Sequence, residues 1–434
     1  MNRGWLESVF EWRAVRWVAG LAFLCRGYLR WLSGARYRAM EDFCWVSRVV
    51  RLEPLLGVAD RMIADVLQEA RRSGRNPIVG WYRESSASHR LADVYALSGP
   101  SSADLWRDVI VLKSATDAEK GVILLKYTRT FSAMVALFDL DTLMQRYTFV
   151  LEPCWAGYCD PAILMFFSPG NPVFVQCFTL EDRAFIERVG APFVPVSLGP
   201  ADWVDAEVFE QPASRDKRFD LVMVANWGRH KRHSILFQAL QGLRDRDTRV
   251  LLVGFPWAGR SADDVRREAS LWPNPRVTFE IVENIPHVEL ARLLAQCRVF
   301  VFLSKKEGDN KALVEAMFAD VPVIVYDRSV GGAASRVNAE TGVFSSDREL
   351  ADKIRYMLDH HAEFSPRRWA LEHTGSGVAT KALDGALRGA TLSSGGAYST
   401  GIVEKTNAPN LAYKHQSDRA RFQQDYDFIV SCRR

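Results

Sequence analysis

One stretch decides the fold: Val299-Phe-Val-Phe-Leu-Ser-Lys-Lys-Glu-Gly-Asp-Asn-Lys-Ala-Leu-Val-Glu-Ala-Met-Phe-Ala-Asp-Val-Pro-Val-Ile-Val325. Two apolar runs, residues 299–303 and 321–325, enclose a glycine-containing turn and a segment with helical character. Short apolar runs bounded by polar turns are typical of buried strands. The stretch therefore predicts a strand, a turn, a helix and a second strand, the repeating unit of a parallel α/β sheet.

Two carboxylates stand at this turn. Glu307 follows the first strand, and Glu315 lies eight residues later, within the predicted helix. Ligands bind at the carboxyl edge of open parallel sheets, and the first amides of a helix can hold anionic or hydroxyl-rich groups. A solvated pair on a surface turn is the alternative. The strand-to-helix junction, followed by Ala-Met-Phe-Ala and Pro-Val-Ile-Val, favours a site.

A basic loop follows another predicted strand. Its sequence is Ala225-Asn-Trp-Gly-Arg-His-Lys-Arg-His233, and a helix is predicted directly after it. Five basic residues at a strand's carboxyl edge, next to a helix N-terminus, suit a diphosphate. The alternative is a basic surface loop. Because both loops fall on the same edge of one predicted sheet, together they favour a shared anion site.

Residues 218–390 alternate between strands and helices, which predicts a doubly wound domain. The expected strands are Phe219–Ala225, Arg249–Gly254, Val277–Val282, Val299–Leu303 and Pro322–Tyr326, and the expected helices are His233–Leu243, Asp263–Ser270, Val288–Gln296, Lys311–Phe318 and Arg348–His360.

Residues 46–212 are expected to form another α/β domain, and the polar stretch Glu210–Lys217 marks the boundary between the two. Its expected strands are Asp108–Lys113, Gly121–Lys126, Thr148–Leu151, Val173–Gln176 and Phe193–Val196, with helices at Ser132–Gln145 and Thr179–Val189. Thr179 and Asp182 suggest a capping box. Residues 391–434 are predicted to be a polar tail that docks in part through Asp425–Val430.

Residues 1–45 form a separate basic, tryptophan-rich segment. Such a helical arm can lie in a membrane interface, with arginines on anionic lipid. The alternative, an arm packed on the protein with solvated arginines, stays open. The apolar run Trp17–Cys25 is nine residues long, whereas a spanning helix needs about 20. The arginines are at 3, 13, 16, 26, 30, 36 and 38, and the tryptophans are at 5, 12, 17, 31 and 45.

Composition excludes several classes of protein. At 434 residues, a net charge of +4 argues against a nucleic-acid-binding protein. Seven scattered cysteines and the absence of a secretory signal indicate reduced thiols in the cytoplasm and no zinc site. The Asp139-Leu-Asp141 pattern lies in a predicted helix, where i and i+2 do not share a face, so no metal site is expected. No G-x-G-x-x-G follows a strand, which argues against a dehydrogenase.

Three ordered blocks carry a family resemblance. Val222–His233, Val277–Val282 with Leu290–Ser304, and Glu307–Val325 resemble the nucleotide-sugar-binding domain of GT-B retaining glycosyltransferases, the group often called glycosyltransferase family 4. The resemblance covers residues 218–360. It implies two Rossmann-like, doubly wound domains that face a central cleft, in addition to the N-terminal helical arm.

The resemblance also implies residue roles. Glu315 should bind the ribose hydroxyls, Glu307 should contact the donor sugar, and Lys231 with Arg229 should neutralise the diphosphate. Donor contacts are further implied for Gly308, Asp309, Asn310, Lys311, Ala312 and Asn226. The donor is a nucleotide-diphosphate sugar, and no cofactor or metal is required. The family commonly has an aromatic residue and a glycine after Glu-Gly, whereas this chain has Asp309-Asn310-Lys311, so we expect a reshaped sugar pocket.

The first domain should supply the acceptor site. Trp155 and Asp160 follow a predicted strand, and His89 is the only histidine of that domain. Each has a structural alternative: a surface loop for the first two and a local hydrogen bond for the histidine.

These observations predict a retaining glycosyltransferase of polysaccharide, glycolipid or envelope glycan synthesis. Its acceptor would be a glycan, a lipid-linked molecule or a small molecule. It would be cytoplasmic, and residues 1–40 would place it on the inner face of the cell membrane if the lipid interpretation of the arm holds. A non-catalytic nucleotide-sugar sensor or scaffold and a nucleotide-sugar epimerase stay open as alternatives.

Overall fold

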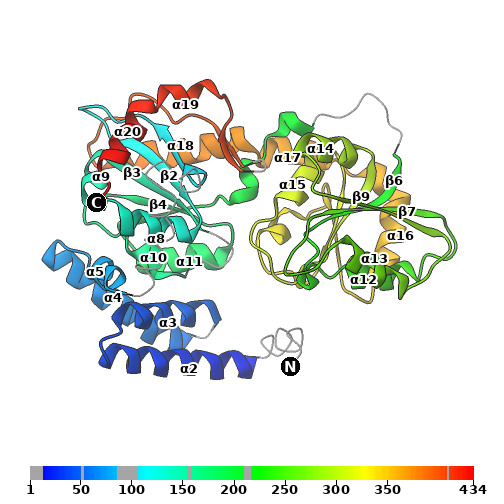
Figure 1. The fold of residues 1–434 in the computed structure, drawn as a ribbon, viewed down its shortest axis with the longest axis horizontal. Helices are drawn as coiled ribbons and strands as arrows, with labels where there is room; N and C mark the ends of the chain where they lie inside the picture. Colours follow the sequence, from blue (N-terminus) through cyan, green and yellow to red (C-terminus); the bar gives the residue numbers. More distant parts are fainter. Residues whose placement is uncertain (1–12, 50–52, 86–105, 154–158, 210–216, 408–409) are drawn as a thin grey trace. The chain divides into compact units, whose positions relative to one another are not determined.

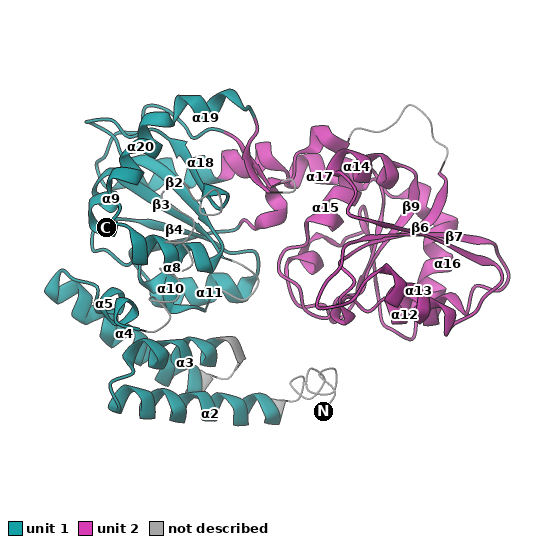
Figure 2. Cartoon of the chain, viewed as in Figure 1, with its two compact units in different colours: residues 1–197, 383–403, 415–434 teal, residues 198–382, 404–414 magenta. Residues whose placement is uncertain are grey.

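A computed structural model describes residues 13–49, 53–85, 106–153, 159–209, 217–407 and 410–434. The chain forms two compact units (Figure 2), each described here by itself. Unit 1 comprises Met1–Ser197, Leu383–Val403 and His415–Arg434, and unit 2 comprises Leu198–Ala382 and Glu404–Lys414. The first division follows Ser197, ahead of the polar stretch where the sequence placed it. The C-terminal tail is shared between the two units.

Unit 2 is built on a six-stranded sheet with the order β11-β10-β9-β6-β7-β8, and every pair is parallel. The chain builds outward from β6 to β8 and then returns to the other side of β6 with β9. This reversal gives the predicted doubly wound topology and a switch point between β6 and β9. The strands are β6 (Phe219–Val224), β7 (Thr248–Gly254), β8 (Val277–Glu283), β9 (Cys297–Phe302), β10 (Val323–Tyr326) and β11 (Gly342–Ser345).

Helices cover both faces of this sheet. One apolar core lies under α14, α15 and α17, and a second lies under α12, α13 and α16. The strands β6, β7, β9 and β10 are buried along most of their length because both faces are covered, whereas the edge strands β8 and β11 are more exposed. The helices are α12 (His233–Leu240), α13 (Ala262–Ser270), α14 (His287–Ala295), α15 (Lys311–Phe318), α16 (Leu350–His360) and α17 (Pro366–His373).

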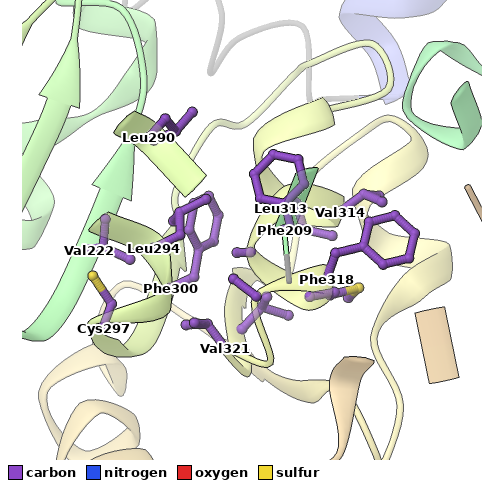
Figure 3. Close-up of a cluster of buried hydrophobic side chains, with 14 of the residues drawn as sticks. Phe209, Val222, Leu290, Leu294, Cys297, Phe300, Leu313, Val314, Phe318 and Val321 are labelled. Atoms are coloured by element: carbon purple, nitrogen blue, oxygen red, sulfur yellow. The ribbon is translucent and has the colours of Figure 1, made fainter. Parts of the chain in front are cut away.

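The helix α15 has the predicted bounds. Asn310 begins it as the N-cap, since its side-chain oxygen accepts a hydrogen bond from the Leu313 amide at 2.9 Å. Leu313, Val314 and Phe318 lie in the same buried apolar cluster as strand residues such as Phe300 (Figure 3). Burial of an apolar side chain of this size contributes about 1.5–3 kcal/mol. The packed face therefore fixes the position of the turn before it.

Unit 1 contains a five-stranded sheet whose strands follow chain order, β1-β2-β3-β4-β5. β1 is antiparallel to β2, and the remaining pairs are parallel. The α/β class is confirmed for both units. Among the described strands, those of unit 1 follow chain order without a reversal, whereas the doubly wound order is found in unit 2. The strands are β1 (Val109–Lys113), β2 (Gly121–Lys126), β3 (Tyr147–Glu152), β4 (Val173–Gln176) and β5 (Phe193–Val196).

The connecting helices of unit 1 are α8 (Thr128–Leu137), α9 (Leu140–Arg146), α10 (Pro161–Leu164) and α11 (Leu180–Val189). The single helix predicted over Ser132–Gln145 is divided at Asp139, which is the N-cap of α9 and accepts hydrogen bonds from the amide and hydroxyl of Thr142. The predicted capping box of Thr179 and Asp182 is present.

The N-terminal helices continue beyond the predicted arm. They are α2 (Arg13–Leu32), α3 (Arg36–Val49), α4 (Glu53–Ser73) and α5 (Pro77–Arg83). Gly27 of α2 allows the close approach of Phe43 of α3, because a Cβ at this glycine would lie 2.7 Å from that ring. The helices α4 and α5 are tied to the body of unit 1 by hydrogen bonds from Arg71 to Ala191 O and from Asn76 to Leu164 O. Among the described residues, no helix is long and apolar enough to cross a membrane.

The C-terminal region serves both units. In unit 1, α20 (Gln423–Ser431) docks through buried Tyr426 and Ile429, and Tyr147 donates a hydrogen bond to Asp425 at 2.8 Å. The long helix α18 (Ser376–Ser393) begins in unit 2 and ends in unit 1. In unit 2, β12 (Lys405–Asn407) and β13 (Leu411–Tyr413) form an antiparallel pair. The short helix α19 (Ser417–Arg421) precedes α20 (Figure 1).

Candidate donor-binding site in unit 2

The switch point of the unit 2 sheet joins the two loops that the sequence singled out. Lys231 lies in the short 3-10 helix η3 (Arg229–Lys231) that follows β6, and Glu307 lies in the loop that follows β9. The Lys231 ammonium donates a hydrogen bond to the Glu307 carboxylate, and the two side chains are 7% and 22% exposed. The structure thus places the predicted cation and the predicted carboxylate in direct contact, at the edge where ligands bind in such sheets.

The basic loop has a fixed shape. The Asn226 side chain accepts a hydrogen bond from the Gly228 amide at 3.0 Å, and the buried Trp227 indole donates to Glu283. A Cβ at Gly228 would lie 2.4 Å from the exposed His230 ring, so a larger residue there would require that ring to move. Asn226, predicted as a donor contact, therefore holds the turn that carries Lys231.

Not all of the predicted positive charge is available to a ligand. Burial lowers the pKa of His233 to about 3, so this ring is neutral at physiological pH. Arg232 donates to Leu303 O at 3.0 Å and pairs with Asp347. Arg229 is exposed in the same turn as Lys231. The geometry therefore favours Arg229 over Arg232 as the second cation.

The acidic loop is held by a glycine turn that the sequence analysis did not identify. The Glu307 amide donates to Val330 O at 3.0 Å, and the Gly332 amide donates to Gly308 O at 2.9 Å. Gly331 has φ +140°, and a Cβ there would lie 2.1 Å from Glu307 O. The Gly331-Gly332 doublet is the signal that could have indicated this close approach.

Glu315 has a partner that the sequence analysis also missed. His287 begins α14, and its Nε2 lies 3.0 Å from Glu315 Oε1. Both side chains are largely buried, and the Phe209 ring meets the imidazole edge-on at 5.2 Å. The helix was predicted to begin at Val288, which left His287 outside it. Since a histidine that contacts a carboxylate fixes its orientation, the pair defines where Glu315 points.

The three residues that depart from the family pattern are engaged within unit 2. The Asp309 carboxylate is buried against Arg336 and accepts a hydrogen bond from the Ala201 amide at 2.8 Å. Asn310 caps α15, and the Lys311 ammonium donates to Asn407 O at 2.7 Å. These contacts direct the three side chains toward the protein. Gly308 and Ala312, beside them, are half-buried.

A small hollow lies beside Lys231, between the carboxyl ends of β6 and β9. It is lined by Met223, Val224, Ala225, Lys231, Val301, Phe302, Leu303, Ser304 and Asn310. The described residues contain no group of three histidines, cysteines or acids arranged to hold a metal ion.

The predicted acceptor residues belong to unit 1. Asp160 is described, and its carboxylate accepts a hydrogen bond from the Ala162 amide at 2.8 Å as the N-cap of α10. Trp155 and His89 lie outside the described residues.

The chain was also compared with known proteins. Residues 204–370 match the sequence family Glycosyl transferases group 1. The matched residues lie within unit 2. The matched segment includes Lys231, His287, Glu307, Glu315 and Arg336. No curated protein matches the sequence.

Solved structures similar to this chain include two bacterial proteins. Anabaena HepE, in complex with UDP-glucose, is 15% identical with a TM-score of 0.47, and the match covers 61% of this chain and 78% of HepE. Sucrose-phosphate synthase from Thermosynechococcus elongatus is 20% identical with a TM-score of 0.48, and the match covers 63% of this chain and 74% of the synthase.

Proposed function

We propose that this protein transfers a glycosyl group from a nucleotide-diphosphate sugar to an acceptor hydroxyl with retention, in glycan, glycolipid or polysaccharide synthesis. The contact between Lys231 and Glu307 carries the proposal. It joins an anion-binding cation and a hydroxyl-binding carboxylate at the switch point of a group 1 glycosyl transferase domain.

The positively charged side chains bind the diphosphate, and the carboxylates bind the hydroxyl groups of the donor. Lys231 and Arg229 neutralise the diphosphate, which takes the place of Glu307 as the partner of Lys231. Glu315, oriented by His287, accepts hydrogen bonds from the ribose hydroxyls, and Glu307 lies toward the transferred sugar. As the bond from the anomeric carbon to the phosphate oxygen breaks, its electron pair passes to the phosphate, where the cations stabilise it. The acceptor oxygen bonds to the same face of that carbon, and its proton leaves to a phosphate oxygen.

A nucleotide-sugar panel tests the proposal. Thermal shift should identify the donor, because a ligand that binds only the folded state raises the melting temperature. The product of turnover with that donor, observed by NMR, should keep the anomeric configuration. Glu307→Gln should lower turnover by about 100- to 1,000-fold. A wild-type-like rate in this variant would overturn the role of Glu307. Donor binding without turnover over an acceptor panel would indicate a sensor, and product formed without acceptor would indicate an epimerase.

We also propose that α2 brings the enzyme to the inner surface of a membrane. Its outward positions form an apolar stripe that includes Val18, Leu29 and Leu32, the last 82% exposed. The arginines of this segment suit anionic headgroups. Flotation with anionic liposomes should fall for the Leu29→Glu, Leu32→Glu variant. Leu180→Glu, at an equally exposed apolar position in α11, is the control. Equal flotation of all forms would exclude this contact.

A further inference from the structure

Two of the three departures from the family pattern bind segments far away in the sequence. Asp309 contacts the start of unit 2 near Ala201, and Lys311 contacts the C-terminal β12–β13 pair, which enters unit 2 at Glu404. They flank Asn310, the cap of the helix that carries Glu315. The loop between the two glutamates is therefore attached on both sides to non-local structure.

The first attachment is a buried ionic network. The Arg336 guanidinium donates to both Asp309 and Asp202, reaching Asp202 at 2.9 Å. Asp202 also accepts a hydrogen bond from the Thr374 hydroxyl at 2.7 Å. The Arg336 side chain is 8% exposed and that of Asp309 is fully buried. A buried charge that is both paired and hydrogen-bonded fixes geometry closely, since every displacement leaves charge unmatched.

The second attachment involves the C-terminal pair of strands. The Asn407 carbonyl accepts the Lys311 hydrogen bond, and the Asn407 side chain donates to Pro200 O at 3.1 Å. Lys405, fully buried beside Asn407, places its ammonium 3.9 Å from the centre of the Trp203 ring. Both attachments thus meet at the 3-10 helix η1 (Pro200–Trp203), directly after the chain enters unit 2.

We propose that Asp309 and Lys311 are positioning residues that hold the donor-binding loop against η1 and the C-terminal strand pair, so that segments at both ends of unit 2 set the affinity for the donor diphosphate. This inference rests on the proposed function. Neither side chain needs to touch the donor. They act through Glu307, two residues before Asp309, and through the first turn of α15, which begins at Lys311.

The geometry explains why such support matters here. The acidic loop has left the sheet, and its backbone contacts to Val330 and Gly332 hold its first half only. Asp309 and Lys311 hold the second half, where the first amides of α15 face the carboxyl edge. A small displacement of a loop that orients charged groups weakens every electrostatic contact to a ligand.

Two variants of the full-length protein test this, with a matched control. Asp309→Asn removes one charge and leaves Arg336 paired with Asp202. Lys311→Met removes a milder, half-buried contact, so that one informative variant folds even if the other does not. Asp220→Asn is the control: Asp220 also pairs with an arginine and accepts a backbone hydrogen bond, from Arg249 at 2.7 Å, but at the opposite, amino end of the same sheet.

Calorimetry with UDP, GDP and ADP, and with inorganic pyrophosphate, gives the measurement. The diphosphate that wild type binds should bind about tenfold more weakly to Asp309→Asn and Lys311→Met. Asp220→Asn should lose melting temperature without losing affinity. Equal diphosphate affinity in wild type and Lys311→Met would overturn the positioning role while the proposed function stands. Failure of wild type to bind any of these probes or any member of the nucleotide-sugar panel would overturn both.

Discussion

The two sheets of this protein carry the same pair of residue types at adjacent strand ends, with different results. In unit 1, Lys126 and Glu152 end the neighbouring strands β2 and β3 in register, 3.9 Å apart, and are 3% and 0% exposed. In unit 2, Lys231 and Glu307 follow the neighbouring strands β6 and β9 and are 7% and 22% exposed. The Lys126–Glu152 pair is therefore buried, and the Lys231–Glu307 pair is accessible in part to solvent.

Strand order accounts for the difference. In unit 1, β2 and β3 are consecutive strands connected by α8 and α9. In unit 2, β6 and β9 are neighbours whose outgoing connections lead to opposite sides of the sheet, since α12 packs in one core and α15 in the other. The two connections therefore diverge at this edge of the sheet, which is where ligands bind in open α/β sheets. The comparison teaches that a cation–carboxylate pair at strand ends indicates a site only when the topology leaves it open.

Replacing each of the two lysines by methionine should separate a role in glycosyl transfer from a role in stability most clearly. Lys231→Met should lower turnover by about 100- to 1,000-fold, because the leaving diphosphate loses its principal cation. Lys126→Met leaves Glu152 buried without its ion pair, and should lower the free energy of unfolding by about 3–5 kcal/mol. Turnover is measured with the donor identified by the panel, and stability by urea unfolding.

Donor affinity is also measured for Lys126→Met, because the two lysines should differ in their effect on donor binding. Lys126→Met enzyme, assayed where it remains folded, should bind donor with wild-type affinity. If this variant loses donor affinity while Lys231→Met retains its activity, the site has been assigned to the wrong unit.

Much of unit 2 could be predicted because its signals are local. The helix Lys311–Phe318 was predicted with its observed bounds, because a capping residue, an apolar face and flanking strands all agree within the stretch Val299–Val325. Lys231 and Glu307 were placed at one edge because parallel strands bring their carboxyl ends together. The edge strand β11 was missed, since Gly342–Ser345 is short and only half buried.

The remaining features depend on contacts between distant residues. His287 pairs with a carboxylate 28 positions away, and Arg336 meets Asp202 across 134 positions. The spacing of apolar residues within a segment does not indicate which distant residues will be in contact. For the same reason, the sequence suggested a sugar-pocket role for Asp309 and Lys311, whereas the structure shows their side chains bound to Arg336 and Asn407.

Glycine substitutions should show whether the backbone turn at Gly331 positions the acidic loop that carries Glu307. Gly331→Ala forces a Cβ onto Glu307 O at 2.1 Å from a backbone with φ +140°. We expect a cost of about 3 kcal/mol, expressed as a displaced acidic loop and weaker donor binding.

Gly170→Ala in unit 1 is the matched control. Gly170 also has a positive φ, +80°, but a Cβ there would meet nothing within 4 Å. It should cost about 1 kcal/mol of unfolding free energy and leave donor affinity unchanged. Equal donor affinity in Gly331→Ala and Gly170→Ala would show that the glycine turn does not position Glu307.

The smallest expected effect is an opposite dependence of stability on pH in the two units. Burial raises the pKa of Asp182 in unit 1 to about 7, from 3.8, and lowers the pKa of His233 in unit 2 to about 3, from 6.5. The folded state therefore binds the Asp182 proton more tightly than the unfolded state does, so this contribution is greatest below pH 3.8 and is lost as pH rises toward 7. The contribution of His233 is greatest above pH 6.5 and is lost as pH falls toward 3.

Single substitutions should isolate the contribution of each group to the pH dependence of the free energy of unfolding. Asp182→Asn retains a side-chain oxygen for the Thr179 amide. As pH rises from 5 to 7, the free energy of unfolding of this variant should increase by about 2 kcal/mol relative to that of wild type. His233→Phe, which places an apolar ring beside Trp227, should gain a similar amount between pH 6.5 and pH 5. Urea unfolding at these pH values measures both. Parallel pH profiles for Asp182→Asn and wild type would mean that the Asp182 carboxyl is not held in its neutral form by burial, and the same comparison applies independently to His233. Because the two slopes have opposite signs, the contributions of Asp182 and His233 partly cancel in wild type between pH 5 and pH 6.5 if the two units unfold together.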